Sequence, residues 1–449
     1  MGRITLEQAA LWCGGKIDPK YKDVTFFGAN NDTRKIEEGQ LFVALQGQRD
    51  GHDFIPQALE AGAAAILCTH CDTDFPAIVV DDTRLALGQI AREYRKQLSI
   101  KVVGVTGSVG KSTTKEMISA VLESTYRVAK TPANHNNDIG MPMAVLSIPE
   151  DTEIAVLEMG MNHFGEISYL TAIGKPDVAV ITNIGTMHIE HLGSREGILQ
   201  AKLEIIEGMP ESGTLVLNGD DDMLWSRRNA TGKKTVYFGI ENSNCQILAE
   251  NTVAEKGSLT FDLNKGFPVR LDLEGNHYIL DALAAVAVGL EMGVTPENIQ
   301  NSLHNFQNMP GRQEIYEKKG FTIIQDCYNA GPESMKAALT VLGDRPGRRI
   351  AVLGDMLELG VRTHAEHYKA GRVAAAKADI LLAYGANSLH MLHGAITGGM
   401  SRARARAFTE KDQLVQVLRQ LAKPGDVLLF KGSRGMRMEL ILEAFLAEE

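Results

Sequence analysis

The first hundred residues alternate short apolar runs with segments of helical periodicity. Apolar runs at 41–45 and 77–80 have the length of strands, and the patterns near 54–61 and 84–97 place apolar residues at helical spacing. This alternation predicts a small α/β unit over residues 1–98.

A second unit, residues 99–310, starts where the β-branched run at 101–105 meets a glycine-rich turn and then an amphipathic helix. The apolar runs at 154–157 and 178–181 continue into polar residues, as expected of buried parallel strands with functional carboxyl ends. Between 246 and 273 apolar and polar residues alternate, which predicts antiparallel strands. Two further helices are expected at 277–292 and 297–306.

The third unit, residues 311–449, follows a break at Met309-Pro310-Gly311-Arg312. Strands and helices alternate regularly in it, which predicts a doubly wound, Rossmann-like sheet. The expected strands are 321–325, 349–353, 379–383 and 426–430, and the expected helices lie near 333–342, 364–377, 410–421 and 436–447. The chain is therefore expected to be an α/β protein of three domains, the central one a parallel sheet with an antiparallel segment.

Composition excludes several classes of protein. With 449 residues, of which 44% are hydrophobic and 23% charged, the chain has an ordinary globular composition and is too long for one core. A net charge of −10 argues against binding of nucleic acid, which needs a basic surface. No apolar stretch approaches the ~20 residues that span a bilayer, and no signal peptide is visible, so we expect a cytoplasmic protein.

One segment carries a strong chemical signal, because a strand, a glycine-rich loop and a helix follow one another. Glycines allow backbone N–H groups to converge on a phosphate, and the start of the helix adds positive potential. Lys111 would neutralise the β- and γ-phosphates, and the Ser112 hydroxyl would ligate magnesium. The strict P-loop has glycine where this chain has Val105, so the loop is a variant; the alternative is a glycine-rich turn that merely precedes a lysine. The expected nucleotide-binding residues are Gly107, Ser108, Val109, Gly110, Lys111, Ser112 and Thr113.

Two candidate metal ligands follow neighbouring predicted strands. Glu158 comes directly after one strand, and His188 lies beyond the next. A nucleoside triphosphate needs a divalent cation to offset its charge, and these strand ends share a sheet edge with the phosphate loop. We therefore expect magnesium to be held by Ser112, Glu158 and His188, although a loop histidine by itself is more often structural or solvated. The guanine-binding pattern Asn-Lys-x-Asp is not completed at 264–267, which favours ATP.

Three further groups of polar residues are given structural rather than chemical roles. Cys68-Thr69-His70-Cys71 resembles half a zinc site, but no second half follows, so a buried strand end is the better interpretation. His364 and His367 lie at helical spacing and are expected on a helix surface, and solvent exposure is expected for Arg402, Arg404 and Arg406.

Several blocks occur in an order that resembles one enzyme family. They are Asp32-Thr33-Arg34 with Gly39-Gln40-Leu41-Phe42-Val43-Ala44-Leu45, Asn136-Asn137-Asp138-Ile139-Gly140, Tyr328-Asn329-Ala330 and Lys431-Gly432-Ser433-Arg434. Together with the phosphate loop they resemble the Mur ligases, the ATP-dependent amide-forming enzymes of peptidoglycan precursor synthesis, over essentially the whole chain. The resemblance implies an N-terminal domain that holds a UDP-sugar, a central ATPase domain and a C-terminal Rossmann-like domain that closes over both.

The resemblance also implies roles that spacing alone does not identify. Lys202 matches a lysine that is carbamylated in relatives, although a lysine near the start of a helix is usually a solvated surface charge. Carbamylation would turn a cation into an anion beside the metal, and Lys202 joins Lys111 and His188 as the expected catalytic residues. ATP contacts from across the closing interface are implied for Arg312, Asp326 and Asn329. The residues that match the UDP-substrate side are Thr33, Arg34, Gln46, Gly47 and Arg49, with Asn136 and Asn137 nearer the peptide.

One block departs from the family pattern. Where many relatives have His-Asn-x-x-Asn, this chain has His277-Tyr278-Ile279-Leu280-Asp281. A carboxylate at Asp281 accepts a hydrogen bond but cannot donate one, so an amide contact to ATP from this block is not expected.

Within the family, the blocks favour the member that joins D-alanyl-D-alanine to a UDP-N-acetylmuramoyl-tripeptide. The sibling that adds diaminopimelate or lysine has a histidine-containing block in place of Tyr328-Asn329-Ala330, and its diaminopimelate-adding form has an Asp-Asn-Pro-Arg motif that this chain lacks. The implied reaction is an ATP-dependent ligation of small molecules through an acyl phosphate, and we expect a monomer. Whether the third peptide residue is diaminopimelate or lysine stays open.

Two rival hypotheses remain. Folylpolyglutamate synthase or another amino-acid-adding Mur enzyme would share the central domain. A P-loop nucleotide switch would use closure to signal rather than to synthesise, but the N-terminal unit with its own Asp-Thr-Arg block counts against it.

Overall fold

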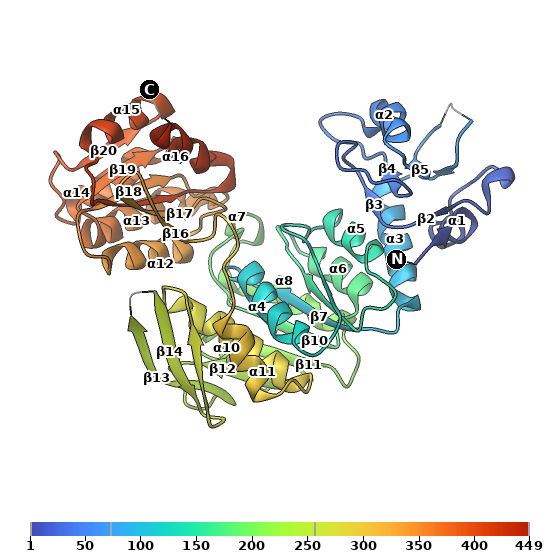
Figure 1. Cartoon of the computed structure of the whole chain (residues 1–449), viewed down its shortest axis with the longest axis horizontal. Coiled ribbons are helices and arrows are strands. Elements are labelled where there is room, and N and C mark those ends of the chain that lie inside the picture. The colour runs from blue at the N-terminus through green and yellow to red at the C-terminus, as the bar shows by residue number, and fades with distance from the viewer. Residues whose placement is uncertain (1, 72–73, 256, 448–449) are drawn as a thin grey trace.

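The computed structural model describes residues 2–71, 74–255 and 257–447, and its central α/β unit lies between the other two (Figure 1). Strands of the N-terminal unit fall within 4–79, those of the central unit within 101–271 and those of the C-terminal unit within 314–431. The α/β class expected from the sequence is confirmed. Among the described residues no helix has both the length and the apolar character needed to span a lipid bilayer.

The N-terminal unit contains a short antiparallel pair and a parallel sheet. Its strands are β1 (Ile4–Thr5), β2 (Thr25–Phe26), β3 (Ala29–Asn30), β4 (Leu41–Val43), β5 (Ala65–Cys68) and β6 (Ala77–Val79), the last four forming the parallel sheet in that order. Its helices are α1 (Leu6–Cys13), α2 (Ile55–Glu60) and α3 (Thr83–Gln97), with 3₁₀ turns at η1 (Pro19–Tyr21) and η2 (Gly51–Phe54).

Helix α3 fastens this unit to the central one. Asp82 caps its N-terminus by accepting from the N–H groups of Arg84 and Leu85 at 2.8 and 3.0 Å. Near its C-terminus the buried Arg95 donates to the carbonyl oxygens of Gly174 and Ile100, each at 3.2 Å. One hydrophobic core runs from the N-terminal sheet through α3 into the central sheet. The two units therefore share their apolar interior.

The central sheet has nine strands in the order β15-β14-β13-β12-β11-β10-β7-β9-β8. The parallel strands are β7 (Lys101–Thr106), β8 (Val128–Lys130), β9 (Ile154–Glu158), β10 (Val178–Ile181), β11 (Thr214–Asn218) and β12 (Lys234–Gly239). The antiparallel segment expected at 246–273 is confirmed as β13 (Ile247–Glu255), β14 (Ser258–Leu263) and β15 (Phe267–Leu271).

The helices of the central unit cover both faces of this sheet. They are α4 (Lys111–Glu123), α5 (Gly140–Leu146), α6 (Glu166–Gly174), α7 (Ile189–Leu192), α8 (Arg195–Leu203), α9 (Asp222–Trp225), α10 (His277–Glu291) and α11 (Pro296–His304), with a 3₁₀ turn at η3 (Glu204–Gly208). Helix α10 is apolar nearly all round and packs against α4, so that the phosphate-loop helix is enclosed between a helix and the sheet.

The C-terminal sheet has six strands in the order β16-β17-β21-β18-β19-β20, with β16 the one antiparallel edge strand. The strands are β16 (Glu314–Lys318), β17 (Phe321–Asp326), β18 (Arg349–Gly354), β19 (Ile380–Tyr384), β20 (Ala405–Phe408) and β21 (Val427–Lys431). The helices are α12 (Pro332–Gly343), α13 (Thr363–Lys377), α14 (Ser388–Thr397), α15 (Lys411–Leu421) and α16 (Met438–Leu446), with 3₁₀ turns at η4 (Gly360–Arg362) and η5 (Arg434–Met436). Separate cores lie under α12–α14 and under α15–α16, as expected of a doubly wound sheet.

The expectation that His364 and His367 lie on a helix surface is wrong for His367. That side chain is completely buried; its Nε2 accepts a hydrogen bond from the Met356 N–H at 3.0 Å, and its Nδ1 lies 2.6 Å from the Thr363 carbonyl oxygen. The ring lies against the segment that follows β18, 3.6 Å from Asp355 Oδ1. Helix α14, which the hydrophobic pattern did not predict, packs against α13.

Helices α13 and α14 approach backbone to backbone, because a Cβ added to Gly394 would lie 1.9 Å from the carbonyl oxygen of Tyr368. We expect Gly394→Ala to lower the free energy of unfolding of the C-terminal unit by about 1–3 kcal/mol, through forced separation of the helices. Urea denaturation measures the loss. Gly47→Ala is the control, since its Cβ would have no neighbour closer than 3.8 Å. An equal effect of both changes would contradict the packing argument.

Candidate functional site

The carboxyl ends of three adjacent strands form the candidate site. Strand β7 pairs in parallel with β9 on one side and β10 on the other. The glycine loop follows β7, Glu158 ends β9, and the segment 182–188 follows β10. The sequence-predicted phosphate loop and both predicted metal ligands thus start from one sheet edge.

The glycines of the loop are required by close contacts as well as by backbone angles. Gly107 has φ 153°, and a Cβ there would lie 1.9 Å from Thr182 Oγ1. Gly110 has φ 85°, in the left-handed region, and a Cβ there would lie 2.6 Å from Asp281 Oδ1. The loop is therefore pressed between the next strand end and α10, and its backbone leads directly into the N-terminus of α4.

Asn183 holds the loop from the neighbouring strand and was not predicted. Its backbone carbonyl accepts from Ser108 N–H at 3.1 Å, and its side-chain oxygen accepts from Val109 N–H at 3.0 Å. A polar residue directly after an apolar strand is the signal that could have identified it.

The side chains expected to contact phosphate and metal have protein partners in this structure. Lys111 Nζ donates to the carbonyl oxygen of Gly107 at 2.9 Å, and burial lowers the pKa of its ammonium group. Ser112 Oγ accepts from Arg312 Nη2 at 2.8 Å, and the Arg312 guanidinium lies 4.0 Å from the centre of the Tyr328 ring. Arg312 therefore contacts the residue that follows Lys111 and joins the C-terminal unit to the phosphate loop. Its contact with ATP stays a prediction.

Glu158 is the buried carboxylate of the site. Its Oε1 accepts from Asn136 Nδ2 at 2.8 Å, while its Oε2 has no hydrogen-bond partner and lies 4.0 Å from Lys115 Nζ. An unpartnered buried carboxylate oxygen at a phosphate loop fits a hard divalent cation. Asn136 lies against this carboxylate, whereas Asn137 uses its side-chain oxygen to accept from the Gly140 N–H at 2.8 Å at the start of α5.

His188 and Glu158 do not form a complete metal cage by themselves. Among the described residues there is no group of three or more His, Cys, Asp or Glu side chains arranged to hold a metal ion. The predicted set contains only two such residues beside Ser112, so further oxygen ligands would have to come from water and phosphate. His188 Nδ1 lies 2.7 Å from Glu358 Oε2 of the C-terminal unit, a contact that no local sequence pattern predicts.

Lys202 lies in the last turn of α8, not near the start of a helix, and its side chain is 2% exposed. It has no hydrogen-bond or ion-pair partner among the described residues, and burial, with the nearby Lys111 charge, lowers its pKa well below the usual value. A surface role is therefore excluded, and the neutral amine is stabilised.

On the C-terminal side, Lys431 brings two predicted ATP residues together. Its Nζ donates to Asp326 Oδ2 at 2.6 Å and to the Asn329 carbonyl oxygen at 3.0 Å. Asp326 ends β17 and Asn329 follows it, and the end of β17 lies beside that of β21.

The residues expected on the UDP-substrate side lie apart from the phosphate loop, in the N-terminal unit. Arg34 forms a bidentate contact with Asp32, each bond 2.8 Å long, and is otherwise exposed. Gln46, Gly47 and Arg49 lie exposed in a turn between β4 and η2, and Thr33 is half-buried beside Arg34. Their role stays a prediction.

Asp281 accepts a hydrogen bond in this structure, as expected of a carboxylate. It is buried, and Thr114 Oγ1 donates to its Oδ1 at 2.7 Å, so it bonds to α4. Burial raises the pKa of this carboxyl to about 7. The protonated form is therefore populated near neutrality.

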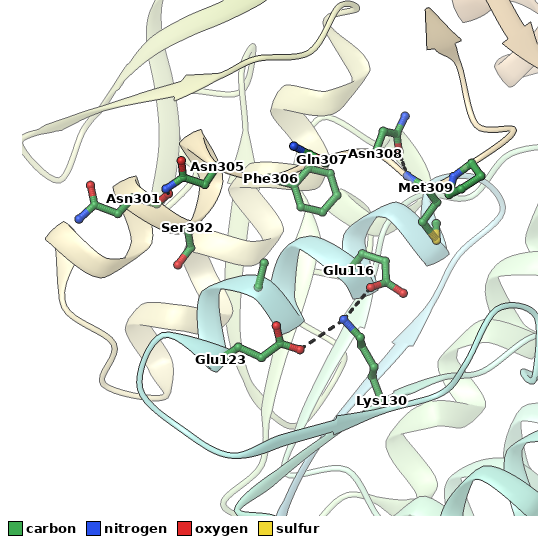
Figure 2. Close-up of a pocket in the computed structure, with 12 residues that line it drawn as sticks. Glu116, Glu123, Lys130, Asn301, Ser302, Asn305, Phe306, Gln307, Asn308 and Met309 are labelled. Carbon is green, nitrogen blue, oxygen red and sulfur yellow. Dashed lines mark hydrogen bonds and ion pairs between the residues drawn. The ribbon is translucent and has the colours of Figure 1, made fainter.

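A cavity of about 590 Å³ borders the linker that leads to Arg312 (Figure 2). It is lined by α4, by the end of α11 and by residues 305–310. Lys130 also lines the cavity, and its Nζ lies 2.9 Å from Glu116 Oε2 and 3.3 Å from Glu123 Oε1. No residue of the glycine loop lines it, so this hollow is separate from the candidate site.

Comparison with family models gives three consecutive matches. The model described as Mur ligase family, catalytic domain, matches residues 28–95, the Mur ligase middle domain matches 105–289, and the Mur ligase, glutamate ligase domain matches 311–434.

Similar proteins span the whole chain. The UDP-N-acetylmuramoyl-tripeptide–D-alanyl-D-alanine ligase of Bacillus subtilis (strain 168) is 43% identical over 441 residues, covering 96% of this chain and 95% of the relative. The Escherichia coli (strain K12) protein of the same name is 37% identical and covers 98% of each chain. A crystal structure of MurF from Acinetobacter baumannii superposes with a TM-score of 0.91 at 32% identity over 100% of both chains. MurF ligase from Thermotoga maritima in complex with ADP has a TM-score of 0.81 at 32% identity, covering 93% of this chain and 97% of that one.

The raised pKa of Asp281 predicts a pH-dependent stability. The carboxyl titrates near 3.8 when unfolded and about 7 when folded, so its ionisation destabilises the fold as the pH rises through that window. We expect Asp281→Asn, which never ionises, to raise the melting temperature relative to wild type more at pH 8 than at pH 5. Thermal unfolding at both values measures this. Thr114→Val serves as the control for loss of the hydrogen bond alone, and a difference independent of pH would contradict the raised pKa.

Proposed function

This chain belongs to the Mur ligase family, and on that premise we propose that it joins D-alanyl-D-alanine to a UDP-N-acetylmuramoyl-tripeptide with cleavage of ATP. The observation that carries the proposal is the phosphate loop at the junction of the central and C-terminal units, where Lys111, Ser112 and Arg312 meet. Relatives that bear this activity in their names align with the chain from end to end.

The reaction has two steps. The terminal carboxylate of the tripeptide attacks the γ-phosphorus of ATP, which forms an acyl phosphate and releases ADP. The free amine of D-alanyl-D-alanine then attacks the acyl carbon, loses a proton and expels inorganic phosphate, leaving a new amide bond. The chain's part is to orient the two reactants and to exclude water that would hydrolyse the acyl phosphate.

Each unit has a distinct task in this proposal. Residues 1–98 bind the UDP-sugar, 99–310 bind ATP, and 311–449 close over both. Lys111 neutralises phosphate charge, while the backbone N–H groups from Gly107 to Thr113 cradle the phosphates. Arg312, Asp326 and Asn329 approach the nucleotide from the C-terminal side.

Magnesium is assigned to Ser112, Glu158 and His188. The support is the buried, unpartnered Oε2 of Glu158 and the oxygen-rich chemistry of the set. When bound, the ion offsets the charge of the triphosphate. Because ATP and a UDP-linked precursor are its reactants, we place the activity in the cytoplasm, and because Arg312 and the loop that it contacts belong to one chain, a monomer is sufficient.

Lys202 is proposed to carry a carbamate. Burial favours its neutral amine, which is the form that adds to carbon dioxide, and the modified side chain would be an anion beside the cationic Lys111. Carbamylation would replace a buried amine that has no partner among the described residues by a carboxylate that can pair with Lys111.

The function is tested by incubating the pure protein with UDP-N-acetylmuramoyl-tripeptide, ATP and either D-alanyl-D-alanine or single amino acids, and measuring ADP and the UDP-linked product. We expect a pentapeptide and ADP only with the dipeptide. Lys111→Ala should reduce kcat by on the order of 10²–10³, because a charge on the transferring phosphate loses its partner. Lys96→Ala, at an exposed lysine, is the control. Turnover with an amino acid instead, or slow ATP hydrolysis indifferent to every acceptor, would contradict the proposal.

The carbamate is tested with Lys202→Ala. We expect the variant to lose most of its kcat and to regain part of it when a short carboxylic acid such as acetate or formate is added, since the acid can occupy the space of the carbamate. Lys202→Met, which fills that space with an apolar chain, should not be rescued. Full activity of Lys202→Ala without any added acid would exclude the modification from the mechanism.

A further inference from the structure

The segment that carries His188 is held by the C-terminal unit as well as by its own strand. The backbone N–H and the Oγ1 of Thr186 both donate to Glu333 Oε1, each at 3.0 Å. Two residues on, His188 Nδ1 lies 2.7 Å from Glu358 Oε2. Two carboxylates of the C-terminal unit therefore dock on the same short stretch of the central unit.

The loop that carries Glu358 is anchored at the three residues that precede it. Each of the three residues before it is hydrogen-bonded to a different element of the C-terminal unit. The bonds are Asn387 N–H to Asp355 Oδ1 at 3.2 Å, Met356 N–H to His367 Nε2 at 3.0 Å and Leu357 N–H to Ser433 Oγ at 2.9 Å. The buried His367 therefore helps to hold the loop that carries Glu358.

Both partners of this contact have unusual backbones. Glu358 and His188 each have φ 61°, in the left-handed region that non-glycine residues rarely adopt. Such conformations are strained and persist where surrounding contacts hold the backbone in place, often at functional sites. Here both side chains are aimed across the boundary between two units.

The contact acts on one defined nitrogen of the imidazole ring. The Nδ1 and Oε2 atoms are within hydrogen-bond distance but off the ideal direction, so the carboxylate acts on the ring as a close charge. A carboxylate on one ring nitrogen fixes the tautomer and leaves the other nitrogen as the metal ligand.

We infer that Glu358 is a positioning residue that, from the C-terminal unit, orients the ring of His188 and leaves Nε2 free to ligate. This rests on the proposed function, in which His188 is a metal ligand. The consequence is a coupling between docking and chemistry: the unit that closes over the reactants also completes the orientation of a ligand near the triphosphate. If ATP binds before the C-terminal unit docks, the ring of His188 is not yet oriented. This limits hydrolysis of ATP in the absence of the other reactants.

The test compares Glu358→Gln with Glu410→Gln, a change at an exposed glutamate elsewhere in the same unit. In the protein labelled with ¹⁵N-histidine and without substrates, the His188 ring signals are assigned with His188→Gln. We expect wild type and Glu410→Gln to show the tautomer protonated at Nδ1, and Glu358→Gln to lose that preference. We also expect the magnesium concentration for half-maximal ADP release to rise 10- to 100-fold in Glu358→Gln, with KM for D-alanyl-D-alanine unchanged.

Three outcomes would overturn the inference: ring signals that do not change in Glu358→Gln, a magnesium requirement that stays the same, or one that falls. The last would make the contact an inhibitory one. The ring measurement needs no substrate, so failure of the wild-type protein to make the pentapeptide would count against the proposed function and not against the contact.

Discussion

The structure is organised around polar side chains that are buried without their full set of hydrogen bonds. Lys202 and Glu158 are each 2% exposed, yet the lysine has no ion-pair partner among the described residues and one oxygen of the glutamate has no hydrogen bond. Burying a polar group without a hydrogen bond costs free energy, so a fold retains such groups where a ligand supplies the missing partner. The glycine loop lies at the same sheet edge as Glu158, and Asn183 and Arg312 both contact that loop.

The three units are joined by two different kinds of contact. The N-terminal and central units share one hydrophobic core through α3, which makes their separation costly. The C-terminal unit has its own cores and meets the central unit through polar contacts, among them Arg345 with Glu274 and Arg312 with Ser112. Polar contacts of this kind can be exchanged for water, so the C-terminal unit is the one suited to move.

Asp281 illustrates how burial changes what a residue type can do. Its place under the glycine loop is fixed by Thr114 and by the closeness of Gly110. In water its carboxyl would be a permanent acceptor, but in this enclosed position the acid is populated near neutral pH. Aspartate at position 281, in place of the asparagine of the family pattern, therefore puts a titratable carboxyl beside the glycine loop and does not simply remove a contact.

The sequence by itself determined the α/β class, the strand, loop and helix at 101–123, and Glu158 at a strand end, because these depend on periodicity and on polar residues that directly follow apolar runs. The tertiary structure alone decided that His367 is buried, that Lys202 is enclosed, and that Glu358 contacts His188. Each of these depends on an element distant along the chain. Local sequence patterns do not determine which distant surfaces come into contact, because those contacts depend on how whole helices and strands pack.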